Sequence, residues 1–275
     1  MADPKFQILE RFTHAKRADN AYTEDRFVIG PHGAGVIDGA IGPHHTDTTM
    51  ITAALNAVVE YLETLGPGAT ARQTIDQVSV ILADTKTAAG LTEFRYTGGF
   101  HFVFYHRPSR QLWRVGDCQF RHSGQTFTND LEVEAIGARQ RAVMVEAMRL
   151  RGQSDEEIMA SDAYAELFTP FFAPLLDFAH RTDHPLGFGV INGMPVPDQF
   201  IEKHDLSTVS GVSGALVMAS DGYPVVCDTL ADTEARLASL LVRDPMCIHE
   251  HICSKGLRPG QCSFDDRTYL RIKIG

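Results

Sequence analysis

Acidic residues at the ends of apolar runs are the part of this sequence best suited to chemistry. Asp38 closes the run 35–37 and is followed by glycine, and Asp221 closes a longer run that begins at Ala215. An Asp-Gly turn presents a carboxylate at the end of a buried strand. Further acidic residues adjoin strand-like stretches at Glu24-Asp25, Asp117 and Asp265-Asp266. Together they predict a site for a hard divalent cation, because Mg²⁺ and Mn²⁺ prefer oxygen ligands.

Hydrophobic periodicity places these carboxylates among strands and helices. Alternating or short apolar runs predict strands at 25–29, 35–40, 99–106, 111–115, 119–122, 200–204, 215–219 and 268–274. Apolar residues at helical spacing predict helices at 46–65, 70–89, 137–151 and 232–242, and Ser154 is the expected N-cap of a further short helix. The tight turns between residues 99 and 122 predict a meander. Helices inserted between sets of strands favour an α+β fold with antiparallel sheets covered by helices.

The chain has 275 residues and a composition typical of globular proteins, with 44% hydrophobic and 22% charged residues. We expect a single domain over residues 1–275. Residues 152–198 include an irregular, proline-rich stretch that we interpret as a possible insertion or lid.

Charge and apolar content exclude several classes of function. The formal net charge of −10 argues against a nucleic-acid-binding protein, which needs a basic surface. No apolar run approaches the ~20 residues of a membrane span. The N-terminal residues do not resemble a secretory signal, and the five cysteines show no disulfide-like spacing. These features predict a cytoplasmic protein with reduced thiols.

Taken in order, the acidic motifs resemble those of the metal-dependent PP2C-type (PPM) protein phosphatases. The family pattern runs N-E-D, D-G-x-G-G, V-G-D-S-R, A-S-D-G and D-N-x-T. The corresponding segments here are Thr23-Glu24-Asp25, Val36-Ile37-Asp38-Gly39-Ala40-Ile41-Gly42, Val115-Gly116-Asp117-Cys118, Ala219-Ser220-Asp221-Gly222 and Asp265-Asp266-Arg267-Thr268. Each motif is short, but all five occur in family order over nearly the whole chain. The chain is similar to a divergent bacterial member.

The resemblance implies a four-layer α-β-β-α sandwich, in which two packed antiparallel sheets are flanked by helix pairs. It also implies a binuclear Mn²⁺ or Mg²⁺ centre, with a third, weaker ion possible, at an edge of the sandwich. Asp38 would bridge the two ions and, with Asp221, form the catalytic pair. The other implied ligands are Glu24, Asp25, the Gly39 carbonyl, Asp117 and Asp265.

The activity implied is hydrolysis of phosphoserine, phosphothreonine or a similar phosphomonoester. A hydroxide bound to the binuclear centre would attack phosphorus, and the ions would neutralise charge on the phosphoryl oxygens. The expected partner is a phosphoprotein or a small phosphoester. The sequence does not indicate the oligomeric state.

Substrate-binding positions match the family less well than metal ligands do. The arginine expected to bind phosphate is replaced by Asn20, and Arg17 is the nearest candidate for that role. Ala40 stands where some members have a histidine, for which His44 or His45 could substitute, although solvated loop histidines are the simpler interpretation. These departures keep open an alternative function, a catalytically weak or inactive binding or regulatory module.

A second group of potential metal ligands lies between Cys247 and Cys253, with His249 and His251 between them. In a strand these four alternate positions would share one face but would span too far for one tetrahedral ion. In a helix only one Cys-His pair at a time would align. We therefore favour buried thiols beside surface histidines over a zinc site.

Overall fold

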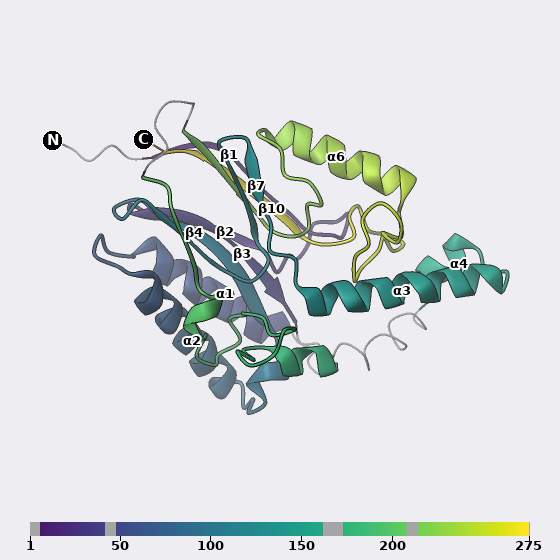
Figure 1. Cartoon of the computed structure of the whole chain (residues 1–275), viewed down its shortest axis with the longest axis horizontal. Coiled ribbons are helices and arrows are strands. Elements are labelled where there is room, and N and C mark those ends of the chain that lie inside the picture. Colours follow the sequence, from purple (N-terminus) through teal and green to yellow (C-terminus); the bar gives the residue numbers. More distant parts are fainter. Residues whose placement is uncertain (1–5, 42–47, 162–172, 208–213, 275) are drawn as a thin grey trace.

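Two five-stranded antiparallel sheets form the centre of the protein. The computed structural model describes residues 6–41, 48–161, 173–207 and 214–274 (Figure 1). In spatial order, the first sheet contains β2 (Arg26–Ile29), β3 (Gly33–Ala40), β4 (Gly99–His106), β5 (Gln111–Val115) and β8 (Glu202–Asp205). The second contains β1 (Gln7–His14), β10 (Arg267–Lys273), β9 (Ala215–Ala219), β6 (Gln119–His122) and β7 (Gln125–Phe127). The predicted α+β class with two antiparallel sheets is confirmed.

The strands alternate between a face that meets the other sheet and a face that meets helices. On β4, Val103 and Tyr105 belong to the core between the sheets, whereas Phe102 and Phe104 pack toward the first helical layer. Successive side chains of a strand point to opposite faces, so both faces of this strand can be apolar. The long apolar run of β4 is explained by its burial on both sides.

Helices α1 (Thr48–Glu63) and α2 (Ala71–Ala88) cover the outer face of the first sheet and lie side by side (Figure 1). Thr70 is the N-cap of α2, and its side chain accepts a hydrogen bond from the Gln73 N–H. Helix α6 (Leu230–Arg243) packs on the outer face of the second sheet through Leu237. The helical layers therefore lie outside the two sheets, as predicted.

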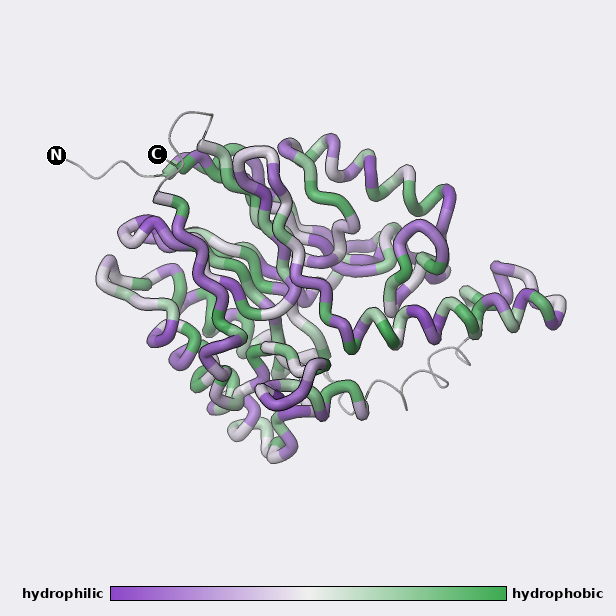
Figure 2. Tube along the Cα trace, in the orientation of Figure 1, coloured by the Kyte–Doolittle hydropathy of each residue, from purple (hydrophilic) through white to green (hydrophobic). Residues whose placement is uncertain are grey.

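Helix α3 (Glu132–Leu150) begins beside the second sheet and extends away from it, with α4 (Asp155–Ala160) folded back at its far end (Figure 1). Val145 and Ile158 form a small core with Met246 and Ile248. Helices α3 and α6 alternate between hydrophobic and hydrophilic segments along their length (Figure 2), as expected of helices with one buried side. No helix within the described ranges is long and apolar enough to cross a membrane.

Two local predictions were wrong. Asp38-Gly39 is not a turn, because β3 continues to Ala40 and pairs Asp38 with His101 of β4. The strands between residues 99 and 122 are not one meander, because β4 and β5 lie in the first sheet and β6 lies in the second. Gly116, with φ +86°, lies in the link between the sheets, in a conformation that few other residues adopt.

Helix α3 also begins five residues earlier than predicted, at Glu132. Residues 176–200 contain two 3₁₀ turns, Leu176–Phe178 and Asp198–Phe200, joined by irregular backbone. A further 3₁₀ turn, Phe94–Tyr96, precedes β4. The interpretation of 152–198 as an insertion or lid, and the single-domain assignment, stay predictions.

Candidate functional site

Asp38 points into the space between the sheets at one end of β3. Val36, two residues earlier, belongs to the core between the sheets, and the twofold repeat of a strand places Asp38 on the same face. An Asp38 carboxylate oxygen accepts a hydrogen bond of 3.3 Å from the backbone N–H of Asp221. This bond joins the end of the first sheet to the turn that follows β9 of the second.

Two glycines allow the chain segments around Asp38 to approach one another. A Cβ on Gly39 would lie 2.6 Å from the Glu24 carbonyl oxygen, and one on Gly222 would lie 2.0 Å from the Asp266 carbonyl oxygen. Both distances are too short for any side chain. The glycines after Asp38 and Asp221 therefore allow the segments that carry Glu24 and Asp266 to close over the site.

Asp25 is the most unusual carboxylate in the site. It is 1% exposed, and neither carboxylate oxygen has a hydrogen-bond partner among the described residues. Burial, and the nearby carboxylates of Asp265, Asp266 and Asp221, raise its pKa well above the ordinary value, against an opposing effect of the Ser220 hydroxyl. A buried polar group without a partner is costly, so this position is poised to accept a cation.

The carboxylates of Asp265 and Asp266, in contrast, have partners at both oxygens. The Asp266 carboxylate accepts hydrogen bonds from the backbone N–H groups of Lys16 (2.8 Å) and Glu24 (2.7 Å). Asp265 pairs with the ammonium groups of Lys16, at 3.4 Å, and Lys255. Despite burial, the two lysines hold the pKa of Asp265 below its ordinary value. Asp266 is therefore a structural residue that holds the segment 16–24 against the site.

Asp117 pairs with His101, whose ring Nδ1 contacts a carboxylate oxygen. The Asp117 and His101 side chains are 12% and 17% exposed, respectively. Burial opposes protonation of the imidazole, but Asp117 and the charges of Asp221 and Glu134 raise its pKa above the ordinary value. The contact with Asp117 thus favours the protonated imidazole.

The carboxylates at the centre of the site repel one another. Burial and the neighbouring Asp221, Asp25 and Asp117 raise the pKa of Asp38 well above its ordinary value. Burial and the charges of Asp117 and Asp265 raise the pKa of Asp221 to about 7. Burial also raises the pKa of Glu24. A divalent cation among these groups would relieve their repulsion and stabilise their ionised forms.

The donor set fits a hard cation in its chemistry. It consists of carboxylate oxygens and a backbone carbonyl, without thiolates, which suits Mg²⁺ or Mn²⁺. Within the described ranges, however, no three Asp, Glu, His or Cys side chains already surround a common point. Asp25, Asp38 and Asp221 are the group best placed to hold an ion, and they would have to close around it.

Arg17, the predicted phosphate ligand, is placed less favourably. Its side chain is 68% exposed and its Nε lies 3.6 Å from a carboxylate oxygen of Asp19. The neighbouring Lys16 reaches the acidic cluster instead. Substrate binding by Arg17 stays a prediction, and His44 and His45 lie outside the described residues.

Sequence reasoning missed three functional candidates, Lys16, Lys255 and His101. Lys16 adjoins Arg17, the predicted phosphate ligand, and His101 lies two residues after the glycine pair 98–99, so each had a weak signal. Lys255 had none, because it lies in a loop without a motif and reaches Asp265 only through the fold.

The Cys247–Cys253 segment does not form one metal site in the described structure. Cys247 is fully buried beside the residues that pack under α6. His249 instead lies 3.3 Å from a carboxylate oxygen of Glu146. The interpretation of buried thiols next to more exposed histidines agrees with this arrangement.

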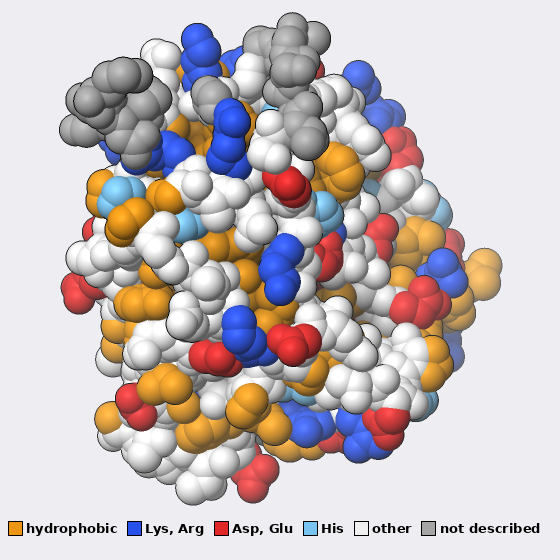
Figure 3. Space-filling model, turned by 60° about the vertical axis from the view of Figure 1, so that its left-hand side comes forward, with side chains coloured by type: hydrophobic (Ala, Val, Ile, Leu, Met, Phe, Trp, Pro, Cys, Tyr) orange, Lys and Arg blue, Asp and Glu red, His pale blue; other side chains and the backbone are white. Residues whose placement is uncertain are grey.

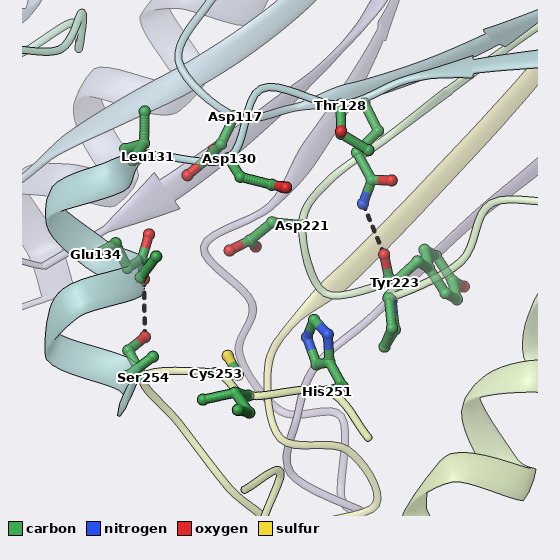
Figure 4. Close-up of a pocket in the computed structure, with 15 residues that line it drawn as sticks. Asp117, Thr128, Asp130, Leu131, Glu134, Asp221, Tyr223, His251, Cys253 and Ser254 are labelled. Atoms are coloured by element: carbon green, nitrogen blue, oxygen red, sulfur yellow. Dashed lines mark hydrogen bonds between the residues drawn. The ribbon is translucent and has the colours of Figure 1, made fainter. Parts of the chain in front are cut away.

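A cavity of about 330 Å³ opens next to Asp117 and Asp221. Figure 4 shows Asp117, Asp130 and Asp221 on one side and Glu134, Ser254, Cys253 and His251 on the others. Ser254 donates a hydrogen bond of 2.8 Å to Glu134. The cavity is acidic and adjoins the carboxylates proposed to hold a cation. Elsewhere, the molecular face in Figure 3 carries basic and acidic side chains interspersed.

Comparisons with known proteins agree with this architecture. No protein-family model matches the chain, and no curated protein matches it in sequence. Among solved structures, the serine/threonine phosphatase Stp1 from Staphylococcus aureus is 14% identical with a TM-score of 0.50, and the match covers 100% of this chain and 99% of that one. The phosphatase PstP/Ppp from Mycobacterium tuberculosis is 15% identical with a TM-score of 0.48, over 97% and 99% of the two chains.

RsbX, solved in complex with magnesium, is 11% identical with a TM-score of 0.46, over 98% and 100% of the two chains. At these identities the comparisons address the fold and not the activity. The match to Stp1 extends over nearly the full length of both chains. The chain has the fold of the bacterial PP2C-type serine/threonine phosphatases.

Proposed function

We propose that this protein is a metal-dependent phosphatase that hydrolyses phosphoserine, phosphothreonine or a similar phosphomonoester. The observation that carries the proposal is that Asp221 and Asp25 both act electrostatically on Asp38, with Asp25 buried and without a hydrogen-bond partner among the described residues. Three carboxylates brought from distant segments into mutual repulsion are costly to the fold. Binding of a Mn²⁺ or Mg²⁺ ion offsets that cost.

The residues of the site would hold and orient the reacting groups. Asp38 and Asp221 are tied together by the bond from the Asp221 N–H, so their carboxylates would face the same ion. The Gly39 carbonyl and Glu24 would complete the ligand set on the side of the first sheet. A bound divalent ion supplies an activated water and neutralises charge on the phosphoryl group. No nucleophilic side chain is then required.

The acidic cavity favours phosphoproteins over small anionic metabolites as substrates. A phosphate group at the ions would place the rest of the substrate toward Asp117, Asp130 and Glu134. Carboxylates there attract positive charge and repel further anionic groups. We therefore expect phosphopeptides with arginine or lysine next to the phosphorylated residue to react faster than peptides with acidic neighbours.

Hydrolysis of p-nitrophenyl phosphate in the presence of Mn²⁺ tests the proposal. Asp38→Asn and Asp221→Asn should each abolish turnover, whereas Asp84→Asn, an exposed change on α2, should not alter it. Circular dichroism of each variant checks that the fold is kept. Wild-type protein that turns over no phosphoester at any Mn²⁺ concentration would contradict the proposed activity.

One observation favours the alternative, a catalytically inactive binding module. Lys16 and Lys255 neutralise Asp265, the carboxylate expected to hold an ion in an active member. Calorimetric titration separates the two functions. Binding of Mn²⁺ or a phosphopeptide without turnover indicates the module, whereas Mn²⁺-dependent turnover that is lost in Asp38→Asn indicates the enzyme.

A further inference from the structure

Asp265, one of the implied metal ligands, already has positively charged partners, although a ligand carboxylate is expected to be available to an ion. One of its carboxylate oxygens accepts hydrogen bonds from the Lys16 ammonium (3.4 Å) and from the backbone N–H of Asp266 (2.9 Å). The other contacts the Lys255 ammonium. Both oxygens are therefore occupied, and the two negative charges of Asp265 and Asp266 face two lysine ammonium groups.

The loop that carries Lys255 is held in place from two sides. The buried Asp244 carboxylate accepts hydrogen bonds from four backbone N–H groups, of Ile248 (3.1 Å), His249 (2.9 Å), Glu250 (2.8 Å) and His251 (3.4 Å). Because four donors converge on one carboxylate, the start of the loop has a fixed shape.

Arg141 of α3 fixes the part of the loop nearer to Lys255. It is 3% exposed and donates hydrogen bonds to the carbonyl oxygens of Cys247 (3.2 Å) and Cys253 (3.0 Å). A Cβ on Gly256 would lie 2.3 Å from a terminal guanidinium nitrogen of Arg141, so the loop packs tightly against the arginine at the residue after Lys255. Lys255 is therefore delivered to Asp265 by an ordered loop.

Asp25, in contrast, has no such lysine contact among the described residues. Asp25 is 1% exposed and, within the described residues, neither of its oxygens has a hydrogen-bond partner. Its nearest charged neighbours are carboxylates, those of Asp265, Asp266 and Asp221. Lysines thus neutralise Asp265, and Lys255 also acts electrostatically on Asp221, whereas Asp25 is the carboxylate of the cluster that is still short of positive charge.

We propose that Lys255 is a resident cation, whose ammonium group takes the place of a second divalent ion at Asp265, so that the protein binds a single ion on the side of Asp25, Asp38 and Asp221. This inference rests on the proposed metal-dependent function. A divalent ion at Asp265 would have to displace Lys255 and would lie close to the Lys16 ammonium, and like charges at such distances repel strongly in a partly buried site.

The charge state of Lys255 agrees with this role. Its ammonium contacts one carboxylate oxygen of Asp265, and an opposite charge in contact favours the charged form of a lysine. The ammonium is therefore retained at physiological pH. Its side chain is also 46% exposed, so the residue can be replaced without opening a cavity in the core.

Manganese binding to the full chain tests the inference without reference to activity. Equilibrium dialysis gives the number of ions per chain, and electron paramagnetic resonance separates an isolated ion from a coupled pair, which lies ~4 Å apart in two-metal sites. Wild-type protein should bind one isolated ion. Lys255→Met, which removes the charge and keeps the length, should bind a second ion that is coupled to the first.

Three further variants complete the experiment. Lys255→Arg keeps the positive charge and should bind one ion, as should Lys203→Met, a change at an exposed lysine on β8. Lys255→Gln is the second neutral variant, used together with circular dichroism in case Lys255→Met does not fold. Both neutral variants should gain the coupled ion.

Two results would overturn the inference and leave the proposed function intact. One is a coupled pair of ions in wild-type protein. The other is a single ion in both folded neutral variants; a raised KM for phosphoester in these variants would then make Lys255 a phosphate ligand. Absence of any bound manganese in wild-type protein would overturn the metal-dependent function and, with it, this inference.

Discussion

Replacing Asp25 by asparagine should stabilise the metal-free protein and weaken its response to Mn²⁺. Asp25 is buried and has no hydrogen-bond partner among the described residues, and its charged neighbours are carboxylates. Asparagine has nearly the same volume and removes the charge. A buried polar group without a partner costs about 1–3 kcal/mol, and more when it is charged. The asparagine amide also lacks a partner but is neutral, so the variant relieves the additional cost of the charge. We expect the free energy of unfolding to rise by about 1–3 kcal/mol.

The size of the expected shift makes the experiment practical. For a chain of this length, 1 kcal/mol corresponds to about 2–4 °C in Tm, so the metal-free variant should melt roughly 2–12 °C higher than wild type. Mn²⁺ at about 100 times its Kd should stabilise wild-type protein by about 2.7 kcal/mol. Most of that gain should be lost in Asp25→Asn. Thermal unfolding followed by circular dichroism, with and without Mn²⁺, measures both effects.

Asp266→Asn is the matched control, because Asp266 is similarly buried but has partners. Its two carboxylate oxygens accept hydrogen bonds from the backbone N–H groups of Lys16 and Glu24. An amide nitrogen in place of one oxygen would face a donor, so this variant should melt lower than wild type. If Asp25→Asn also melts lower, or keeps the full Mn²⁺ shift, Asp25 is a structural residue and the reasoning fails.

Three further predictions concern pH and two buried positions. The pKa of Asp221 is raised to about 7 from its ordinary 3.8, so its protonated form stabilises the metal-free fold below pH 4 by at most about 4 kcal/mol, and this contribution is lost as pH rises through 7. The Tm of the metal-free protein should therefore fall over this pH range, and it should fall less steeply in Asp221→Asn or with saturating Mn²⁺. An identical slope in wild type and Asp221→Asn would refute the assignment. Lys86→Met should lower the free energy of unfolding, measured in urea, by about 3 kcal/mol or more, because the Lys86 Nζ donates hydrogen bonds to three backbone carbonyls that would lose their partner. The control Lys203→Met, at an exposed position, should have little effect. Gly116→Ala should destabilise the fold by about 1–3 kcal/mol more than Gly124→Ala. Both glycines have a positive φ, but only at Gly116 would the new Cβ lie 2.2 Å from the His101 ring. Equal losses of unfolding free energy in the two variants would show that the backbone conformation alone matters.

Local patterns predicted most of the secondary structure, because each element has a strong periodic signal or a clear stop. The predicted bounds of β4, 99–106, agree with the structure, since a glycine precedes it and a proline turn follows it. Ser154 was recognisable as a helix N-cap for a similar local reason. Where the interactions that form an element involve only a few neighbouring residues, the sequence is sufficient to predict that element.

The wrong predictions depend on contacts between distant segments. Asp38-Gly39 has the composition of a turn, but the long β4 continues to pair with it, so tertiary pairing overrides the local preference. The step from β5 to β6 resembles a hairpin, but Gly116 directs the chain to the other sheet. The contact of Lys255 with Asp265 likewise had no local signal.

Asp25 and Asp265 together show why partners, and not residue types, decide the chemistry of this site. The two carboxylates are 1% and 6% exposed, so desolvation acts on both in the same direction. Nevertheless the pKa of Asp25 is raised and that of Asp265 is lowered, because only Asp265 has lysine partners. The fold supplies two ammonium groups to Asp265 and none to Asp25. The free-energy cost of burying the Asp25 carboxylate is therefore not offset by its neighbours. Such a cost is expected where a ligand offsets it, and the chemistry of the neighbours makes that ligand a cation.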